Sequence, residues 1–122
     1  MPAQVVVVLD EPEFANRVAT AVRAAGCEAA TFTDSMAALD ALEAAHRVEL
    51  LVTSVDFAPG KPNGIALARM TRPRRPGIKV LFVGAAGLER HTDGLGKFMP
   101  VPISESELVR AAMRLLQAEE QS

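Results

Sequence analysis

The chain has 122 residues, of which 49% are hydrophobic and 23% are charged, and its formal net charge is −2. These values fit one compact domain over residues 1–122 and argue against a protein that binds nucleic acid directly through its overall charge. The single cysteine, Cys27, excludes an internal disulfide, and the lack of a signal-peptide pattern or of an apolar run of about eighteen residues predicts a cytoplasmic protein that does not enter membranes.

The first third of the chain alternates a short β-branched run with a segment of helical spacing, as βαβ units do. Residues 4–9 are almost entirely apolar, which is typical of a central parallel strand covered on both faces. A helix is predicted to follow Pro12 and to stop at Gly26, because apolar residues recur between them at steps of three and four. The recurring residues are Phe14, Val18, Ala21, Val22 and Ala25.

The next unit repeats this order. Residues 27–32 form a second predicted strand, in which Cys27 is expected to be a small buried thiol. Asp34 is a predicted cap for a second helix, and residues 48–54 form a third strand. The inward stripe of that helix is expected to be Ala38, Leu39, Leu42 and Ala45.

In the second half, Asn63 is a predicted cap for a helix over residues 64–72, which Pro73 and Pro76 close. Strands are predicted over residues 78–83 and 97–99. Ser104 and Glu107 then form a capping box for a last helix, with Leu108, Ala111, Ala112, Leu115 and Leu116 facing inward. A local basic run is interpreted as a solvated loop; it consists of Arg69, Arg72, Arg74, Arg75 and Lys79.

Five strands and five connections predict a doubly wound α/β domain with a five-stranded parallel sheet, flavodoxin-like in its organisation. Only residues 84–96 are available between the last two strands, and they include Gly87, Gly94 and Gly96. The fourth helix is therefore expected to be short or irregular.

In such a sheet, ligands bind outside the carboxyl ends of the strands. Neither a glycine-rich turn nor a phosphate-binding loop with a lysine follows the first strand; Asp10 and Glu11 stand there instead. Two carboxylates suit a hard cation such as Mg²⁺. The alternative is that Asp10 caps the first helix and Glu11 favours its positive end.

Five stretches of the chain match one known family in order and periodicity. Four of them are strand segments, at residues 5–12 (VVVVLDEP), 49–55 (ELLVTSV), 80–84 (VLFVG) and 98–102 (FMPVP), and the fifth is the loop from Pro59-Gly60 to Asn63-Gly64. Together they resemble the receiver domain of two-component response regulators, over residues 5–116. The resemblance implies a (βα)5 receiver fold.

The resemblance also implies the family's chemistry, in which a histidine kinase donates a phosphoryl group to an aspartate with the help of Mg²⁺, a Thr or Ser, and a lysine. By position, the paired acids fall on Leu9 and Asp10, and the phosphoacceptor falls on Ser54. The Thr or Ser falls on Gly84 and the lysine on Val101. Four of these five positions have lost the family's chemical group.

These losses predict a degenerate receiver without phosphoryl transfer. A serine hydroxyl cannot form an acyl phosphate and is a poor nucleophile without an adjacent base. If Asp10 served as that base, it would be a poor metal ligand. Val101 removes the cation that would balance phosphoryl charge. With Leu9 and Ser54 in place of two acids, Mg²⁺ would depend on Asp10, with Glu11 and water. We therefore expect weak Mg²⁺ binding at best and no other cofactor.

A competing alignment counts back from Gly64 and places the acceptor on Asp56. Asp56 lies two residues beyond Ser54 along an extended chain, about 6 to 7 Å away, which exceeds a metal–ligand distance. The alternative of an active receiver phosphorylated on Asp56, with Mg²⁺ at Asp10, therefore requires a shifted strand. Otherwise Asp56 is a polar loop residue.

Phe98 falls on the family's switch-aromatic position, although a fixed hydrophobic residue is the favoured interpretation. The short fourth helix argues against a homodimer through the family's usual face and leaves a dimer through another surface open. We expect a binding module rather than an enzyme, acting by protein contact with a histidine kinase, a regulator or an output domain of bacterial signal transduction. A sensor of a small ligand in the emptied pocket is a third interpretation.

Overall fold

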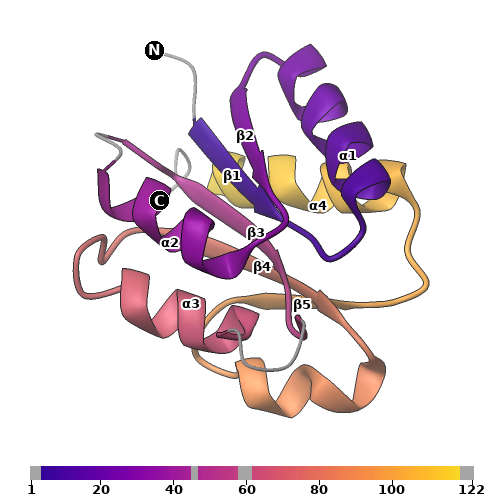
Figure 1. Cartoon of the computed structure of the whole chain (residues 1–122). Helices are drawn as coiled ribbons and strands as arrows, with labels where there is room; N and C mark the ends of the chain where they lie inside the picture. Colours follow the sequence, from indigo (N-terminus) through magenta and orange to yellow (C-terminus); the bar gives the residue numbers. More distant parts are fainter. Residues whose placement is uncertain (1–3, 45–46, 58–61, 119–122) are drawn as a thin grey trace.

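Five parallel strands form the central layer of the molecule (Figure 1). The computed structural model describes residues 4–44, 47–57 and 62–118. The strands are β1 (Gln4–Val8), β2 (Glu28–Phe32), β3 (Leu50–Ser54), β4 (Lys79–Gly84) and β5 (Lys97–Pro100). Their order across the sheet is β2-β1-β3-β4-β5, which confirms the predicted five-stranded parallel sheet.

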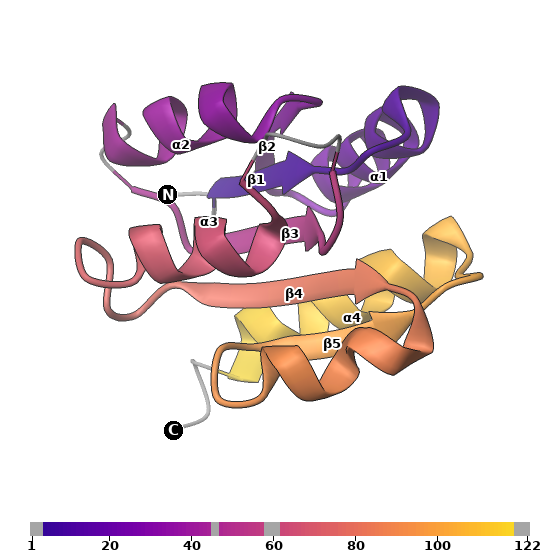
Figure 2. The same ribbon diagram turned by 60° about the horizontal axis from the view of Figure 1, so that its bottom comes forward.

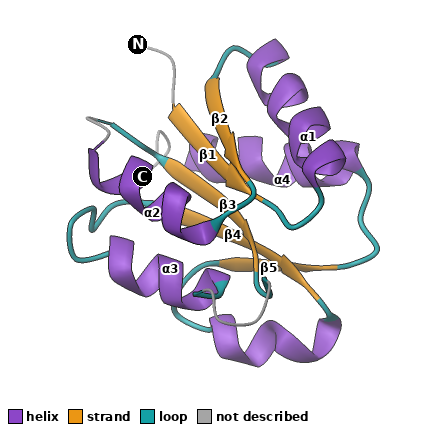
Figure 3. Cartoon of the chain, in the orientation of Figure 1, coloured by secondary structure: helices purple, strands orange, loops and turns teal. Residues whose placement is uncertain are grey.

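Helices cover both faces of this sheet (Figures 2 and 3). The helices α1 (Pro12–Ala24) and α4 (Glu105–Ala118) pack together on one face. The helices α2 (Ser35–Ala44) and α3 (Gly64–Thr71) and the 3₁₀ helix η1 (Ala86–Thr92) lie on the other. The doubly wound arrangement is therefore as predicted. Within the described residues, no helix is both long and apolar enough to cross a lipid bilayer.

The strand β1 contributes to both layers of the core. Val5 and Val7, with Leu9 just after the strand, pack toward α1 and α4, whereas Val6 and Val8 pack toward α2 and α3. Successive side chains of a strand point to opposite faces, so a strand buried on both sides must be apolar throughout. This requirement explains the unbroken apolar run of β1, which lies between β2 and β3 in the sheet.

Three predicted helix caps, those of Asp34, Asn63 and Ser104, are present as hydrogen bonds. The Asn63 side chain accepts from the Ala66 N–H at 2.8 Å, and Asp34 Oδ1 accepts from the Met36 N–H at 2.8 Å. At the start of α4, the Glu107 N–H donates to Ser104 Oγ at 3.1 Å, and the Ser104 hydroxyl donates to a Glu107 carboxylate oxygen at 3.0 Å. These bonds satisfy backbone N–H groups that have no partner within the helix. The alternative that Asp10 caps α1 is wrong, because Glu11 stands at the N-cap and its side chain makes no capping hydrogen bond.

The fourth connection is irregular, as predicted. Instead of an α-helix it forms η1, and the chain then turns at Gly94, which has a φ of 78°. The first helix also ends as predicted: α1 stops at Ala24 and is followed by Gly26 with a φ of 97°. At both Gly26 and Gly94, glycine adopts the left-handed conformation without the steric cost that a side chain would bring.

The apolar residues that recur in the sequence mark the core-facing sides of α1 and α4. The buried stripe of α1 consists of Ala15, Val18, Ala19 and Val22. Phe14 and Ala21 are only half-buried, and Ala25 is exposed, because the stripe is centred one residue further round the helix. In α4, Leu108, Ala111 and Ala112 are buried, and the half-buried Leu115 and Leu116 pack against the same core, so all five residues face inward as predicted. Of the α2 stripe, Ala45 lies outside the described residues, as do Pro59 and Gly60 of the predicted loop.

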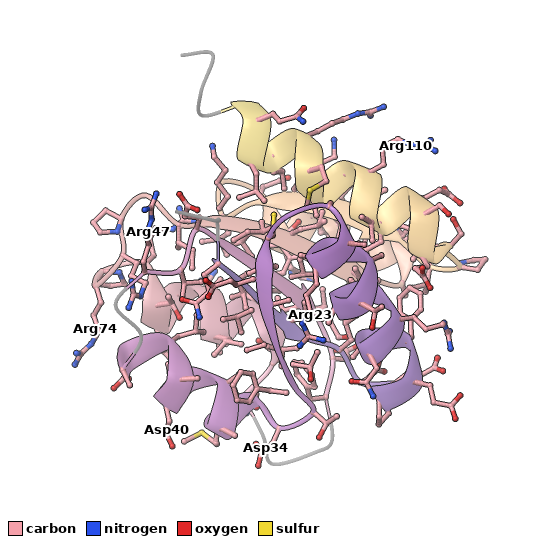
Figure 4. The ribbon with its side chains drawn as sticks, turned by 90° about the horizontal axis from the view of Figure 1, so that it is seen from above. Arg23, Asp34, Asp40, Arg47, Arg74 and Arg110 are labelled. Atoms are coloured by element: carbon pink, nitrogen blue, oxygen red, sulfur yellow. The ribbon has the colours of Figure 1, made fainter. Side chains whose placement is uncertain are left out.

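The basic run is not uniformly a solvated loop. An Arg72 Nη donates to the Leu95 carbonyl, and Arg75 Nε donates to the Leu42 carbonyl at 2.9 Å, so both guanidinium groups tie separate segments together. Arg74 matches the prediction, because it is exposed and points away from the ribbon in Figure 4. The sequence pattern could not separate these roles, since they depend on which carbonyl groups tertiary packing brings within reach.

Cys27 differs slightly from its prediction. It lies just before β2 and is half-buried, with its side chain against the core on the α1 side. Burial raises the pKa of the Cys27 thiol, and the nearby Glu49 carboxylate raises it further. The fold therefore disfavours the thiolate form of Cys27.

Candidate functional site

A pocket of about 630 Å³ lies at the carboxyl edge of the sheet, where β1, β3, β4 and β5 end. It is lined by Leu9, Asp10, Glu11, Phe14, Arg17, Ser54, Val83, Val101, Pro102, Ile103, Ser104 and Glu105. The structure therefore brings together five of the residues singled out from the sequence: Leu9, Asp10, Glu11, Ser54 and Val101. This position agrees with the general rule for ligand sites in open parallel sheets.

Two hydrogen bonds join Ser54 to Asp10 across this edge. The Asp10 N–H donates to Ser54 Oγ at 3.1 Å, and the Ser54 hydroxyl donates to Asp10 Oδ1 at 3.2 Å. The serine is only 5% exposed. Its hydroxyl group thus uses its proton and one lone pair within the protein and links the ends of β1 and β3.

The sheet register explains this juxtaposition. Val8 at the end of β1 pairs with Thr53 in β3, so the residues that follow each strand emerge side by side. On its other side, β3 is fixed by the pairing of Ser54 with Val83 in β4. The next residue continues this pattern, because the Val55 N–H donates to the Val83 carbonyl at 2.9 Å.

Leu9, Gly84 and Val101, the three positions at which the resemblance in sequence would place a polar group, differ in their surroundings. Leu9 is 1% exposed and belongs to the core on the α1 side. Gly84 ends β4, and a Cβ atom there would lie 3.2 Å from Val55 Cγ2, so a larger residue requires Val55 to move. Val101 is 49% exposed at the pocket rim, and its N–H donates to the Gly84 carbonyl at 2.9 Å.

The other wall of the pocket was missed from the sequence. The Arg17 guanidinium lies 5.6 Å from the centre of the Phe14 ring and 3.6 Å from a Glu105 carboxylate oxygen. Phe14 and Arg17 are three residues apart and therefore neighbours on one helix face, which is a signal that was available. The ion pair of Arg17 with Glu105 could not be predicted from neighbouring residues, because it depends on the packing of α1 against α4.

Asp56 does not line this pocket. It is exposed and lines a second pocket of about 540 Å³, formed between the end of β3, α3 and η1. Asp10 and Asp56 thus face different pockets. The Val55 carbonyl between them accepts from the Gly64 N–H at 2.8 Å, which directs the chain after Ser54 toward α3.

Phe98 lies in β5, opposite Phe82 of β4. Its half-buried side chain packs against the core on the α2 and α3 face. It is therefore separated by the sheet from the α1 side, where Leu9 packs.

The donor set at the pocket offers a Mg²⁺ ion two exposed carboxylates, with no third acid arranged beside them among the described residues. Asp10 and Glu11 are the exposed carboxylates beside Ser54, and the residues that stand in the family's other ligand positions, Leu9 and Ser54, offer no carboxylate. Across residues 4–44, 47–57 and 62–118, no group of three or more His, Cys, Asp or Glu side chains is arranged to hold a metal ion. Mg²⁺ prefers several oxygen ligands, usually including one or two carboxylates and a substrate phosphate.

Comparisons with known proteins bear on the fold. No protein-family model and no curated protein matches the sequence. Among solved structures, NtrX from Brucella abortus matches with a TM-score of 0.84 and 23% identity, over 99% of this chain and 28% of that one. This chain thus spans little more than a quarter of NtrX.

Two matches cover nearly their whole length. A response regulator receiver protein from Sinorhizobium medicae has a TM-score of 0.83 at 22% identity, over 96% of both chains. The receiver domain of the hybrid histidine kinase CckA has a TM-score of 0.77 at 25% identity, over 93% of this chain and 99% of that one. The resemblance found in the sequence is therefore confirmed at the level of structure: the chain has the fold of response-regulator receiver domains.

Proposed function

We propose that this chain is a receiver-type module of two-component or phosphorelay signalling that acts through protein contact, without phosphorylation at the acceptor position. In this proposal it is a regulatory module and not an enzyme. The observation that carries the proposal is the pair of hydrogen bonds between Ser54 and Asp10. They hold the nearly buried hydroxyl group of Ser54, which by the resemblance in sequence stands where the family's chemistry needs an exposed carboxylate.

The charges around Ser54, more than its hydrogen-bond geometry, disfavour transfer of a phosphoryl group to its hydroxyl. Asp10 is within hydrogen-bonding distance of the hydroxyl and could accept its proton, so the geometry alone does not make Ser54 inert. However, the transferred group would enter beside the Asp10 and Glu11 carboxylates, which repel a phosphate. The residue at the position of the family's lysine, Val101, supplies no compensating charge.

The surroundings of the substituted positions also support loss of the phosphoryl site. Leu9 is integrated in the core, and Gly84 has Val55 against the space that a side chain would need. A pocket that no longer holds a metal ion or phosphate can bury apolar groups at little cost, whereas unpaired polar groups would be costly there.

The structural neighbours support the class of partner. They include a receiver domain from a hybrid histidine kinase and the larger protein NtrX, of which a receiver-sized part is matched. By analogy, the partner of this chain is a histidine kinase, a regulator or an output domain.

The test is incubation of the protein with acetyl phosphate and Mg²⁺, followed by intact-mass measurement beside an active receiver domain. We expect a phosphoryl gain in the active domain and none in this chain. A base-labile gain of one phosphoryl group that is lost in Asp56→Asn and kept in Asp40→Asn would overturn the proposal in favour of an active receiver. Asp40, labelled in Figure 4, is an exposed aspartate of α2 that lines neither pocket.

The second part of the proposal, that partner binding is independent of phosphorylation, is tested by measuring binding affinity. The affinity of this chain for a histidine kinase of its own organism should be the same with and without acetyl phosphate. An affinity that changes severalfold with the phosphodonor would contradict the proposed independence from phosphorylation.

A further inference from the structure

We propose that the pocket at the carboxyl edge of the sheet binds a small organic cation with an apolar body, such as an arylalkylamine. This inference goes beyond the signalling role and does not depend on it. It rests on the shape of the pocket, its apolar floor and the uncompensated charge on one side.

The pocket has the size and floor of a small-molecule site. Its volume of about 630 Å³ falls within the usual range for such sites, about 300 to 1,000 Å³. Leu9 and Val83 are nearly buried beneath it, and Ile103 is half-buried beside them. Val101, at the rim, is one of three large hydrophobic side chains that are exposed in the described part of the chain. An apolar body placed here would cover that side chain.

The charged groups are unevenly compensated. Arg17 is the only cation among the lining residues that the structure describes, and it pairs with Glu105 while stacking on Phe14. Neither Asp10 nor Glu11 forms an ion pair with any described residue. Only one oxygen of Asp10 accepts the Ser54 hydroxyl. The side of the pocket next to the β1–α1 loop is therefore left with net negative charge.

These two properties together select the class of ligand. An anion would be repelled by Asp10 and Glu11. A divalent metal ion would find two carboxylates and an apolar floor in place of the further oxygen ligands it prefers. An ammonium or guanidinium group on an apolar body satisfies both sides, since its charge meets the carboxylates while its body leaves water for the exposed Val101 and the half-buried Ile103.

The test compares three probes of the same shape and different charge. Phenethylamine, phenethyl alcohol and hydrocinnamate are titrated into ¹⁵N-labelled protein at low salt, and binding is followed by amide chemical shifts. We expect the amine to bind about fivefold more tightly than the alcohol, as one or two partly exposed ion pairs allow, and the carboxylate to bind most weakly. The shifts should map to Asp10, Glu11 and Val101, and added salt should weaken only the amine.

Variants assign the binding to this pocket. Glu11→Gln should weaken the amine about threefold and leave the alcohol unchanged, as expected for loss of one exposed charge. The matched control is Glu13→Gln, an exposed glutamate in the first turn of α1 outside the pocket lining, which should change neither. Val101→Lys adds a cation at an exposed rim position and should abolish amine binding. The amide spectrum of this variant should still show the folded protein.

Three results would overturn the proposal. They are equal affinity for the amine and the alcohol, no shift with any probe at millimolar concentration, and shifts that map to the pocket of Asp56 instead.

Discussion

Two buried serines, Ser54 and Ser35, differ in what their hydroxyl groups contact. Ser54 Oγ accepts the Asp10 N–H and donates to the Asp10 carboxylate. Ser35, in the first turn of α2, is 1% exposed, and its Oγ has no hydrogen-bond partner among the described residues. A buried hydroxyl that is bonded stabilises a fold modestly, whereas one that is unbonded costs free energy.

We predict that Ser54→Ala lowers the free energy of unfolding by about 1 kcal/mol, because the Asp10 N–H and carboxylate lose a shared partner. The loss should be accompanied by changed amide shifts in the β1–α1 loop. Chemical denaturation of both proteins under the same conditions measures the difference.

Ser35→Ala is the matched control, since it removes the same atom from an equally buried position. It should leave stability unchanged or raise it by up to about 1 kcal/mol, because no bond is lost and an unsatisfied group is removed. If both substitutions destabilised the protein equally, the hydrogen bonds of Ser54 would not be the cause.

The thiol of Cys27 gives a prediction for pH dependence. Its pKa is raised by burial and by Glu49, so the folded state favours the neutral thiol. Any stability that comes from this preference is complete below the ordinary thiol pKa and is lost as pH rises through the raised one. We predict slow alkylation by iodoacetamide at mildly alkaline pH, with the rate rising only above the range of a free cysteine.

Two glutamine variants separate the causes of this shift. Glu49→Gln should move the alkylation profile toward lower pH because it removes the carboxylate that acts on the thiol. Glu43→Gln, an exposed position on α2, should leave it in place. A profile centred at or below that of free cysteine would contradict the raised pKa.

At the scale of elements, α3 and β3 approach each other at one glycine. Gly64 is the first residue of α3, and a Cβ atom there would collide with the Ser54 carbonyl oxygen, which is backbone and cannot move aside cheaply. The close approach lets the Gly64 N–H donate to the Val55 carbonyl at 2.8 Å. This hydrogen bond fixes the direction of the chain just after β3, and the position of Asp56 depends on that direction.

Gly64→Ala should therefore lower the free energy of unfolding by at least about 2 kcal/mol, since the overlap must be relieved by shifting backbone. Gly77→Ala is the control, because a Cβ atom at Gly77 meets nothing within 4 Å. It should be neutral or slightly stabilising through the unfolded state. Thermal or urea denaturation compares the two, and similar values for both would show that the approach of α3 to β3 is not tight.

At the scale of the whole molecule, the sequence predicted those features that have local causes. The caps at Asn63 and Asp34 and the stop at Gly26 follow from neighbouring residues, and the apolar run of β1 follows from its burial on both faces. The irregular fourth helix followed from the short, glycine-rich connection.

The site required more than local signals. The positions Leu9, Ser54 and Val101 were expected to meet only because strand ends converge in this fold, and the resemblance supplied their order. The ion pair of Arg17 with Glu105 depends on helix packing that no neighbouring residues specify. The separation of Asp56 from Asp10 depends on where the chain turns after β3.

This arrangement predicts how the stability of the whole domain responds to Mg²⁺. The exposed carboxylates at the pocket are Asp10 and Glu11, beside a hydroxyl group instead of a third acid. We predict that the melting temperature in millimolar MgCl₂ equals that in NaCl of the same ionic strength. Even a concentration equal to the dissociation constant would add only about 0.4 kcal/mol to stability.

The aspartates of the chain provide the control for this measurement. Asp10→Asn keeps an oxygen that can accept the Ser54 hydroxyl while removing the charge, and Asp40→Asn removes an exposed charge elsewhere. A rise of several degrees that is specific to Mg²⁺, lost in Asp10→Asn and kept in Asp40→Asn, would contradict the prediction. It would mean that Asp10 and Glu11 suffice to hold the ion with water completing its shell, and the pocket would then favour a metal over an organic cation.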